Sequence, residues 1–310
     1  MIASMLLVAG LGCADLPGMN EDFDSETIDR GALAALVEAE SPCAEALAVQ
    51  GRLHMQAGET DAGVETFEQL VETHGERSMS HAWLGRALLS RASRDSSLSD
   101  AKSAVRSLEK AIKLDPMNFE ARETLASFHR NAPWIAGGDM DVAEEQAEFI
   151  MQHDRRRGIG VVVSNLVADG DEDEAIELMQ ATLVEHPEWD DIAVQLAVAW
   201  HEEKEFAKAH DLLADYAAKP EPLPMAVYQL GRTAALSGQF IDDGRRAMQR
   251  YIAMVEVDDS LGVPATSAYW RLGNIEEHAG DIEAARAAYR KAVELEPENE
   301  VARKALADLD

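Results

Sequence analysis

Apolar and small residues recur at helical spacing in residues 266–299. Three of them share one face of a helix, at positions i, i+4 and i+7: Ala285, Tyr289 and Ala292. Gly280-Asp281 separates this helix from an earlier one, because glycine accepts the positive φ that closes a helix and aspartate caps the next. Pro297 prevents the second helix from continuing beyond about Leu295. The stretch predicts a helical hairpin. Gly273 is expected at the point where its two helices approach closely, because a small residue is needed there.

The same arrangement recurs earlier in the chain, so the hairpin is one unit of a repeat. Gly51 and Gly85 are 34 residues apart, and so are Ala197 and Gly231. Copies of the pattern occupy these further stretches: residues 49–70, 81–116, 125–150, 170–187, 196–216 and 228–238. Such hairpins stack, and each covers the apolar face that its neighbour leaves open.

These residues resemble the tetratricopeptide repeat, a helix–turn–helix unit of 34 residues. Residues 266–299 match the family pattern nearly in full and depart at Glu276, where the pattern prefers an aromatic residue. The resemblance covers residues 44–299. It implies an all-α fold, a right-handed α-solenoid of about seven stacked repeats. Residues 300–310 are then expected to form a C-terminal capping helix.

Three stretches exceed the family spacing. The first lies between Gly85 and Ala104 and contains the polar stretch RASRDSSLSD, seven residues beyond the family spacing. It either lengthens the hairpin by two helical turns or forms a surface loop. The second is Asn131–Asp139, where Pro133 cannot sit inside a helix and Trp134 is a large apolar residue in a loop. The third is Val257–Pro264.

Two short stretches, APWIAGGD at 132–139 and LSGQF at 236–240, are similar to an uncharacterised group of exported bacterial repeat proteins. The N-terminus fits export, because residues 1–14 are apolar through Gly12 and then abruptly polar, as in a signal peptide. Leu11-Gly12-Cys13 is loosely similar to a bacterial lipoprotein box. Residues 15–43 are then an acidic linker and a leading helix.

The two cysteines leave two alternatives. If Cys13 carries a lipid tether, Cys43 is single and free. If both cysteines remain, a disulfide can form in an oxidising compartment.

The chain is strongly acidic, with 58 Asp plus Glu against 28 Lys plus Arg and a formal net charge of −30. Such a surface repels phosphate backbones, so no nucleic-acid partner is expected. Arg155–Arg157 is too short a basic run to reverse this, and it is interpreted as a solvated helix terminus. No stretch is long and apolar enough to span a bilayer.

Motifs for catalysis and cofactor binding are not found in the sequence. Gly137-Gly138 has no strand before it and no following lysine, so it is interpreted as a turn. Asp169–Glu174 is superficially similar to a calcium loop, but Glu174 stands where that loop needs glycine. Carboxylates there suit a helix N-terminus instead. No metal, no cofactor and no enzymatic activity are therefore expected.

In the family, side chains of the first helices line a concave groove that binds peptides. The resemblance places these residues at the groove: Arg52, Trp83, Arg86, Tyr228, Gln229, Arg232, Trp270, Arg271 and Asn274, together with Ser127 and Val198. Arginine and aromatic side chains are suited to an extended peptide or its terminal carboxylate. The alternative is that the arginines only pair with acidic neighbours on the next repeat.

The leading functional hypothesis is a non-catalytic scaffold that binds a protein or peptide segment. The second is an enzyme, or an enzyme's regulatory subunit, with a site in residues 131–139. The third is a structural spacer. The expected location is the periplasm or, with Cys13 lipidated, the outer membrane; without export the protein is cytoplasmic.

Overall fold

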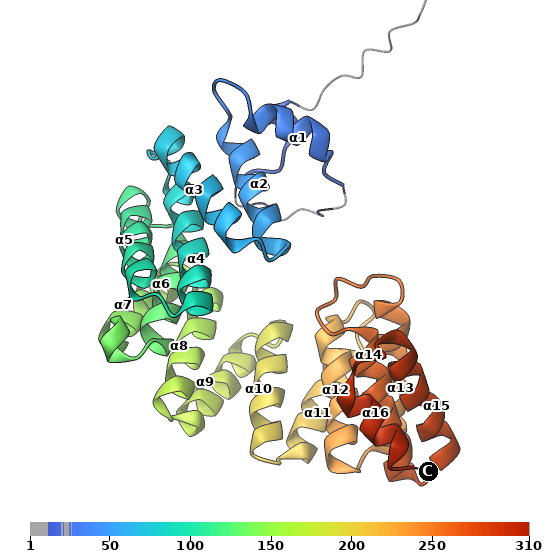
Figure 1. Ribbon diagram of the computed structural model, residues 1–310. Helices are drawn as coiled ribbons and strands as arrows, with labels where there is room; N and C mark the ends of the chain where they lie inside the picture. Colours follow the sequence, from blue (N-terminus) through green and yellow to red (C-terminus); the bar gives the residue numbers. More distant parts are fainter. Residues whose placement is uncertain (1–11, 20, 22–24, 26, 310) are drawn as a thin grey trace, which may run out of the picture. The chain divides into compact units, whose positions relative to one another are not determined.

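The computed structural model describes residues 12–19, 21, 25 and 27–309, and within them it contains sixteen α-helices, two short 3-10 helices and no strand (Figure 1). The chain divides into two compact units, Met1–Asp169 and Gly170–Asp310. Within the described part of the chain, no helix is long and apolar enough to cross a membrane.

The helices of the first unit follow a leading 3-10 helix, η1 (Cys13–Asp15), and form antiparallel pairs along the chain. Their bounds are α1 (Arg30–Val37), α2 (Ala44–Gln56), α3 (Thr60–His74), α4 (Ser78–Asp95), α5 (Leu98–Leu114), α6 (Phe119–Asn131), η2 (Trp134–Ala136), α7 (Met140–His153) and α8 (Arg155–Asp169). Helices α2, α4, α6 and α8 are neighbours in that order, so they share one side of the unit.

The second unit continues the same alternation. Its helices are α9 (Glu172–Glu185), α10 (Asp190–Glu202), α11 (Phe206–Ala217), α12 (Pro224–Ser237), α13 (Ile241–Val255), α14 (Ala265–Ala279), α15 (Ile282–Leu295) and α16 (Glu300–Ala307). Helices α10, α12 and α14 are neighbours on one side of this unit.

The hairpin predicted from residues 266–299 is confirmed. Gly280 adopts a φ of 78° after α14, and the Asp281 side chain accepts a hydrogen bond from the Ala284 N–H at the start of α15. A Cβ at Gly273 would lie 2.3 Å from the Tyr289 ring, which is fully buried. Glycine is therefore required where α14 meets α15, because a large ring from α15 occupies the space beside it.

The equivalent glycines repeat this contact in other hairpins. A Cβ at Gly51 would lie 2.5 Å from Phe67, and one at Gly85 would lie 2.7 Å from Leu108. These hairpins therefore bury one large side chain of the second helix against a glycine of the first helix.

The first stretch beyond the family spacing lengthens a hairpin. Helix α4 has 18 residues and α5 has 17, joined only by Ser96 and Ser97. Ser96 adopts a φ of 53°, which lets the chain reverse in so short a connection. The Ser97 side chain then caps α5 by accepting a hydrogen bond from the Asp100 N–H. The polar stretch is thus helical at both ends instead of forming a loop.

The glycine contacts lead to a prediction for the first unit. Gly51→Ala is expected to lower the free energy of unfolding by roughly 2 kcal/mol, because the added methyl group overpacks the Phe67 ring. Gly160→Ala in α8 is the matched control, since a Cβ there meets nothing within 4 Å. It is expected to raise the free energy of unfolding by roughly 0.5–1 kcal/mol. Urea unfolding measures both, and equal effects at the two sites would contradict the close approach.

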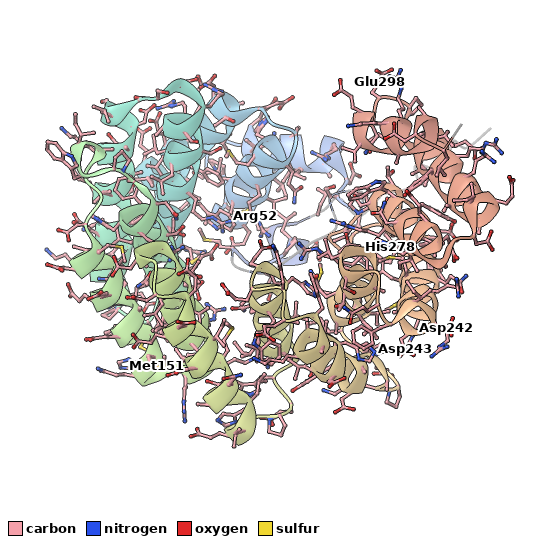
Figure 2. All side chains as sticks on the ribbon, turned by 90° about the horizontal axis from the view of Figure 1, so that it is seen from below. Arg52, Met151, Asp242, Asp243, His278 and Glu298 are labelled. Atoms are coloured by element: carbon pink, nitrogen blue, oxygen red, sulfur yellow. A yellow bond between two sulfur atoms is a disulfide. The ribbon has the colours of Figure 1, made fainter. Side chains whose placement is uncertain are left out.

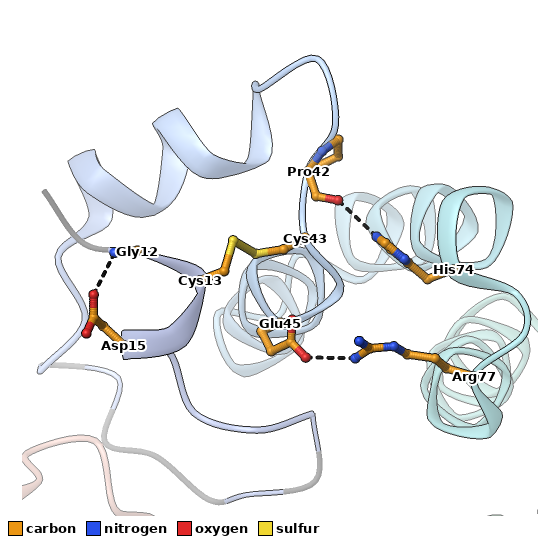
Figure 3. Close-up of a disulfide and its surroundings, with 8 residues drawn as sticks. All are labelled: Gly12, Cys13, Asp15, Pro42, Cys43, Glu45, His74 and Arg77. Atoms are coloured by element: carbon orange, nitrogen blue, oxygen red, sulfur yellow. Dashed lines mark hydrogen bonds and ion pairs between the residues drawn. A yellow bond between two sulfur atoms is a disulfide. The ribbon is translucent and has the colours of Figure 1, made fainter.

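Cys13 and Cys43 form a disulfide with a Cα–Cα distance of 6.3 Å (Figure 3). A sulfur in a disulfide cannot also carry a lipid, so the structure has the paired alternative and not the lipidated Cys13. The apolar segment assigned to a signal peptide lies mostly in residues 1–11, outside the described residues.

Candidate functional site

A groove of about 1380 Å³ lies on the side of the first unit that α4, α6 and α8 share. Its wall also includes the α4–α5 connection. Pro133 and Ala136 line it as well, and they belong to the second stretch beyond the family spacing, residues 131–139, called the second insertion below. The long α4–α5 hairpin extends this wall, because Ser96, Ser97 and Leu98 line it. Two of the stretches that exceed the family spacing therefore meet at one site.

Charged side chains of both signs line the groove. Arg86 of α4 forms an ion pair with Glu120 of α6. Arg157 of α8 lies 3.6 Å from Glu123 and 3.8 Å from Asp154. Burial raises the pKa of Glu123, although Arg157 opposes this effect. The groove can therefore exchange these internal ion pairs for pairs with a ligand of either charge.

Apolar surface lies between these charges. Phe119 and Phe128 of α6 line the groove together with Leu89 of α4, and the Arg157 guanidinium lies 5.8 Å from the Phe119 ring centroid. Beside the groove wall, Trp134 of η2 is 84% exposed and Ile135 is 65% exposed. Large exposed apolar side chains are typical of contact sites, so the second insertion presents such a surface.

The predicted groove residues of the first unit have different environments. Arg86 and Ser127 line the α4–α6–α8 groove. Trp83 lies between two guanidinium groups, with its ring centroid 4.9 Å from Arg52 and 4.7 Å from Arg86. Arg52 comes from α2 and is only 8% exposed (Figure 2).

Arg157 was missed as a groove residue by the sequence reasoning, which interpreted the basic run as a solvated terminus. The run begins α8, the first helix of the fourth pair along the chain. Helix α8 has neither the Leu-Gly of α4, α12 and α14 nor the Leu-Ala of α6 and α10, so its position in the repeat was not assigned. Its apolar and polar residues are also poorly separated between faces, so the periodic pattern of an amphipathic helix does not identify it either.

In the second unit, the predicted groove residues lie close together but largely inside the protein. Tyr228 and Gln229 of α12 are 7% and 8% exposed, so neither offers a free surface. Asn274 of α14 donates a hydrogen bond to the Tyr289 hydroxyl at 2.7 Å. Asn274 thus supports the hairpin core. Val198 lies on α10 and is half-buried.

Two arginines stand together in this unit. Arg232 lies 3.8 Å from Glu202, 3.3 Å from the Gln229 amide oxygen and 3.4 Å from His201 Nδ1. Burial lowers the pKa of Arg271, and Arg232 adds to this effect. The Arg271 guanidinium stacks on Trp270 at 4.2 Å. Arg232 is paired with Glu202, and the two neighbouring cations together form an environment that favours an anion.

Known proteins show the same architecture. Tetratricopeptide repeat family models match residues 48–98 and 266–309. The structure of PilW, titled a widely conserved type IV pilus biogenesis factor, is similar with a TM-score of 0.52 and 20% identity, over 74% of this chain and 98% of that chain. No curated protein matches the chain.

Two further structures are similar over most of this chain. Yeast Tom70 has a TM-score of 0.58 and 15% identity, over 87% of this chain and 57% of that chain. A human IFIT1 dimer with PPP-AAAA has a TM-score of 0.52 and 18% identity, over 86% of this chain and 62% of that chain. At these identities the likeness concerns the fold, and it confirms the predicted all-α solenoid of helical repeats.

Proposed function

We propose that this chain, a tetratricopeptide repeat protein, is a non-catalytic interaction scaffold that binds an extended peptide segment of a partner protein in the α4–α6–α8 groove. The observation that carries the proposal is the groove itself. Its volume of about 1380 Å³ exceeds the roughly 300–1,000 Å³ typical of small-molecule pockets. Its wall combines α4, α6 and Arg157 of α8, and a site of this size is suited to an extended chain.

Binding at this site depends on shape and a few anchors. Arg86 and Arg157 would pair with acidic side chains of the partner, while Phe119 and Phe128 would contact its apolar side chains. Because the groove exists before binding, little free energy is spent on ordering it. In the second unit, Arg232 and Arg271 would by themselves hold a carboxylate of a bound peptide.

The chemistry of the lining favours a scaffold over an enzyme. Among the described lining residues, Glu120 and Glu123 could act as general bases, but they form ion pairs with Arg86 and Arg157. The second insertion contributes Asn131, Ala132, Pro133 and Ala136 to the wall, and none of these side chains is an acid or a base. The exposed Trp134 is accordingly proposed as a contact residue for the partner.

We propose that the protein acts in the cell envelope. The Cys13–Cys43 disulfide supports this, because disulfides persist in oxidising compartments and are rare in the cytosol. The fold likeness to PilW is compatible with the same location. A lipid tether on Cys13 is not part of the proposal, since the sulfurs of Cys13 and Cys43 are bonded to each other.

The test compares two double variants with the same change in charge. Arg86→Glu/Arg157→Glu reverses the two cations of the groove, whereas Lys102→Glu/Lys113→Glu reverses two exposed lysines of α5 that do not line it. Each immobilised protein captures partners from a cell-envelope extract, and the recovered partner is then purified and titrated against all three proteins.

The wild type and the lysine variant are expected to bind the partner equally. The arginine variant is expected to bind roughly tenfold or more weakly, which corresponds to at least about 1.4 kcal/mol. Equal binding by the arginine variant would place the partner outside the groove. Recovery of no partner by the wild type would favour the structural-spacer hypothesis.

A further inference from the structure

Residues 13–19 and 21, called here the N-terminal segment, lie against α2 and α4 of the first unit. Met19 is only 7% exposed, and its side chain joins the apolar cluster formed by Leu47, Phe67 and Leu84. Leu16 is 8% exposed and packs on a different cluster with Leu33 and α2. A segment outside the repeats therefore completes the core beneath the first helices.

The main chain of this segment is bound by side chains of the repeats. Trp83 Nε1 donates a hydrogen bond to the Met19 carbonyl oxygen at 2.8 Å. Arg52 Nη1 donates to the Glu21 carbonyl oxygen at 2.6 Å. Both donors are side chains that point from first helices toward a non-helical chain, which is how a groove binds a peptide backbone. These two bonds would form with the carbonyls of any sequence.

The methionine side chain supplies the selectivity. Arg77, directly before α4, places Nη1 3.4 Å from the Met19 sulfur and also pairs with Glu45 at 2.7 Å. The rest of the side chain lies among apolar groups. An unbranched, polarizable side chain fills such an irregular space well, whereas a polar one would lose its hydration there.

We propose that this surface of α2 and α4 is a second peptide-binding site, which the N-terminal segment occupies as an internal ligand. Its external ligand is an extended peptide with a methionine-like side chain and two accessible backbone carbonyls. The proposal does not depend on the α4–α6–α8 groove, although Arg86 lies between the two sites because it contacts both Trp83 and Glu120.

The disulfide sets how strongly the internal ligand competes. Cys13 is bonded to Cys43, directly before α2, so the segment is attached to the repeats at both of its ends. The Cys43 end is itself held, since His74 Nε2 lies 2.9 Å from the Pro42 carbonyl oxygen (Figure 3). Tethering at two points raises the effective concentration of the segment at the site. External peptides therefore bind the intact protein weakly.

The experiment uses the full chain and a fluorescein-labelled peptide that copies residues 14–21, ADLPGMNE. Fluorescence anisotropy measures binding to the wild type and to a triple variant, Cys13→Ser/Cys43→Ser/Met19→Asp. The variant lacks the disulfide and carries a charged side chain at position 19, so the N-terminal segment competes less well for the site. The variant is therefore expected to bind the probe roughly tenfold or more tightly than the wild type. Circular dichroism confirms that the helices are retained.

Two controls separate a specific site from loosened structure. A probe with serine in place of its methionine is expected to bind the triple variant roughly tenfold more weakly. Adding Trp83→Phe removes the Nε1 donor but keeps a ring to stack on Phe67, whose centroid is 5.8 Å away, and it is expected to weaken probe binding.

Equal binding of the probe by wild type and triple variant, or equal binding of both probes, would overturn the proposal. That result would leave the groove of the first proposal intact, because the Arg86→Glu/Arg157→Glu comparison tests it separately.

Discussion

Replacing Glu276 by glutamine is expected to lower the free energy of unfolding of the second unit by about 3 kcal/mol. The Glu276 side chain is 7% exposed and accepts two hydrogen bonds from Arg245 of α13, at 2.6 and 2.7 Å. These bonds raise the pKa of Arg245. Glutamine keeps the shape but leaves the half-buried guanidinium without its opposite charge. The expected loss in free energy of unfolding lies at the lower end of the range for buried ion pairs, because Asp242, 2.9 Å from Arg245, remains.

Glu283→Gln is the matched control for this prediction. Glu283 pairs with Arg286 at 2.7 Å, but its side chain is 84% exposed. Exposed pairs contribute little, so the control is expected to change the free energy of unfolding by less than about 0.5 kcal/mol. Urea unfolding at pH 7 measures both variants. A loss of similar size in both would mean that burial of Glu276 does not strengthen its pair.

The stability of the second unit is expected to fall as the pH decreases from about 6.5 to about 4, because of His201. Burial lowers the pKa of His201 to about 4, and the charges of Arg232 and Arg271 add to the shift. The unfolded chain, with a histidine pKa near 6.5, then binds more protons than the folded one in this window. The stabilising neutral form is fully present above pH 6.5. The full loss amounts to about 3 kcal/mol.

The measurement compares the wild type with His201→Gln at several pH values between 7 and 4. Glutamine can still bond the Thr233 hydroxyl, which lies 2.8 Å from His201 Nε2, but it does not titrate. The titration of the carboxylates is common to both proteins, so it cancels in the difference between their free energies of unfolding. A difference that stays constant from pH 7 to pH 4 would contradict the prediction.

Much of the fold could be predicted from local patterns. The spacing of Ala285 and Tyr289 places both on the buried face of α15, and Gly280 ends α14 where expected. Such features depend on residues within one helical turn of each other, so the sequence shows them directly. The departure at Glu276 was also visible in the sequence, but its reason was not, because Arg245 lies 31 residues away.

The candidate site was predicted less completely. Arg86 lies on the wall of the candidate groove, whereas Tyr228 and Gln229 are buried. A repeat pattern gives the side of a helix on which a residue lies, but not whether a neighbouring helix covers it. Arg157 was missed because α8 lacks the signature residues of a first helix.

The repeat pattern is enough to specify helices in pairs, their order and their small and large contact residues. These follow from a repeat in which each unit packs mainly on the next. Which groups fill the sites depends on the packing of residues far apart in the chain. The bond from Trp83 to Met19 joins residues 64 positions apart, and the disulfide joins residues 30 apart. Such pairings depend on which distant groups satisfy one another once the chain is packed, and no periodicity encodes them.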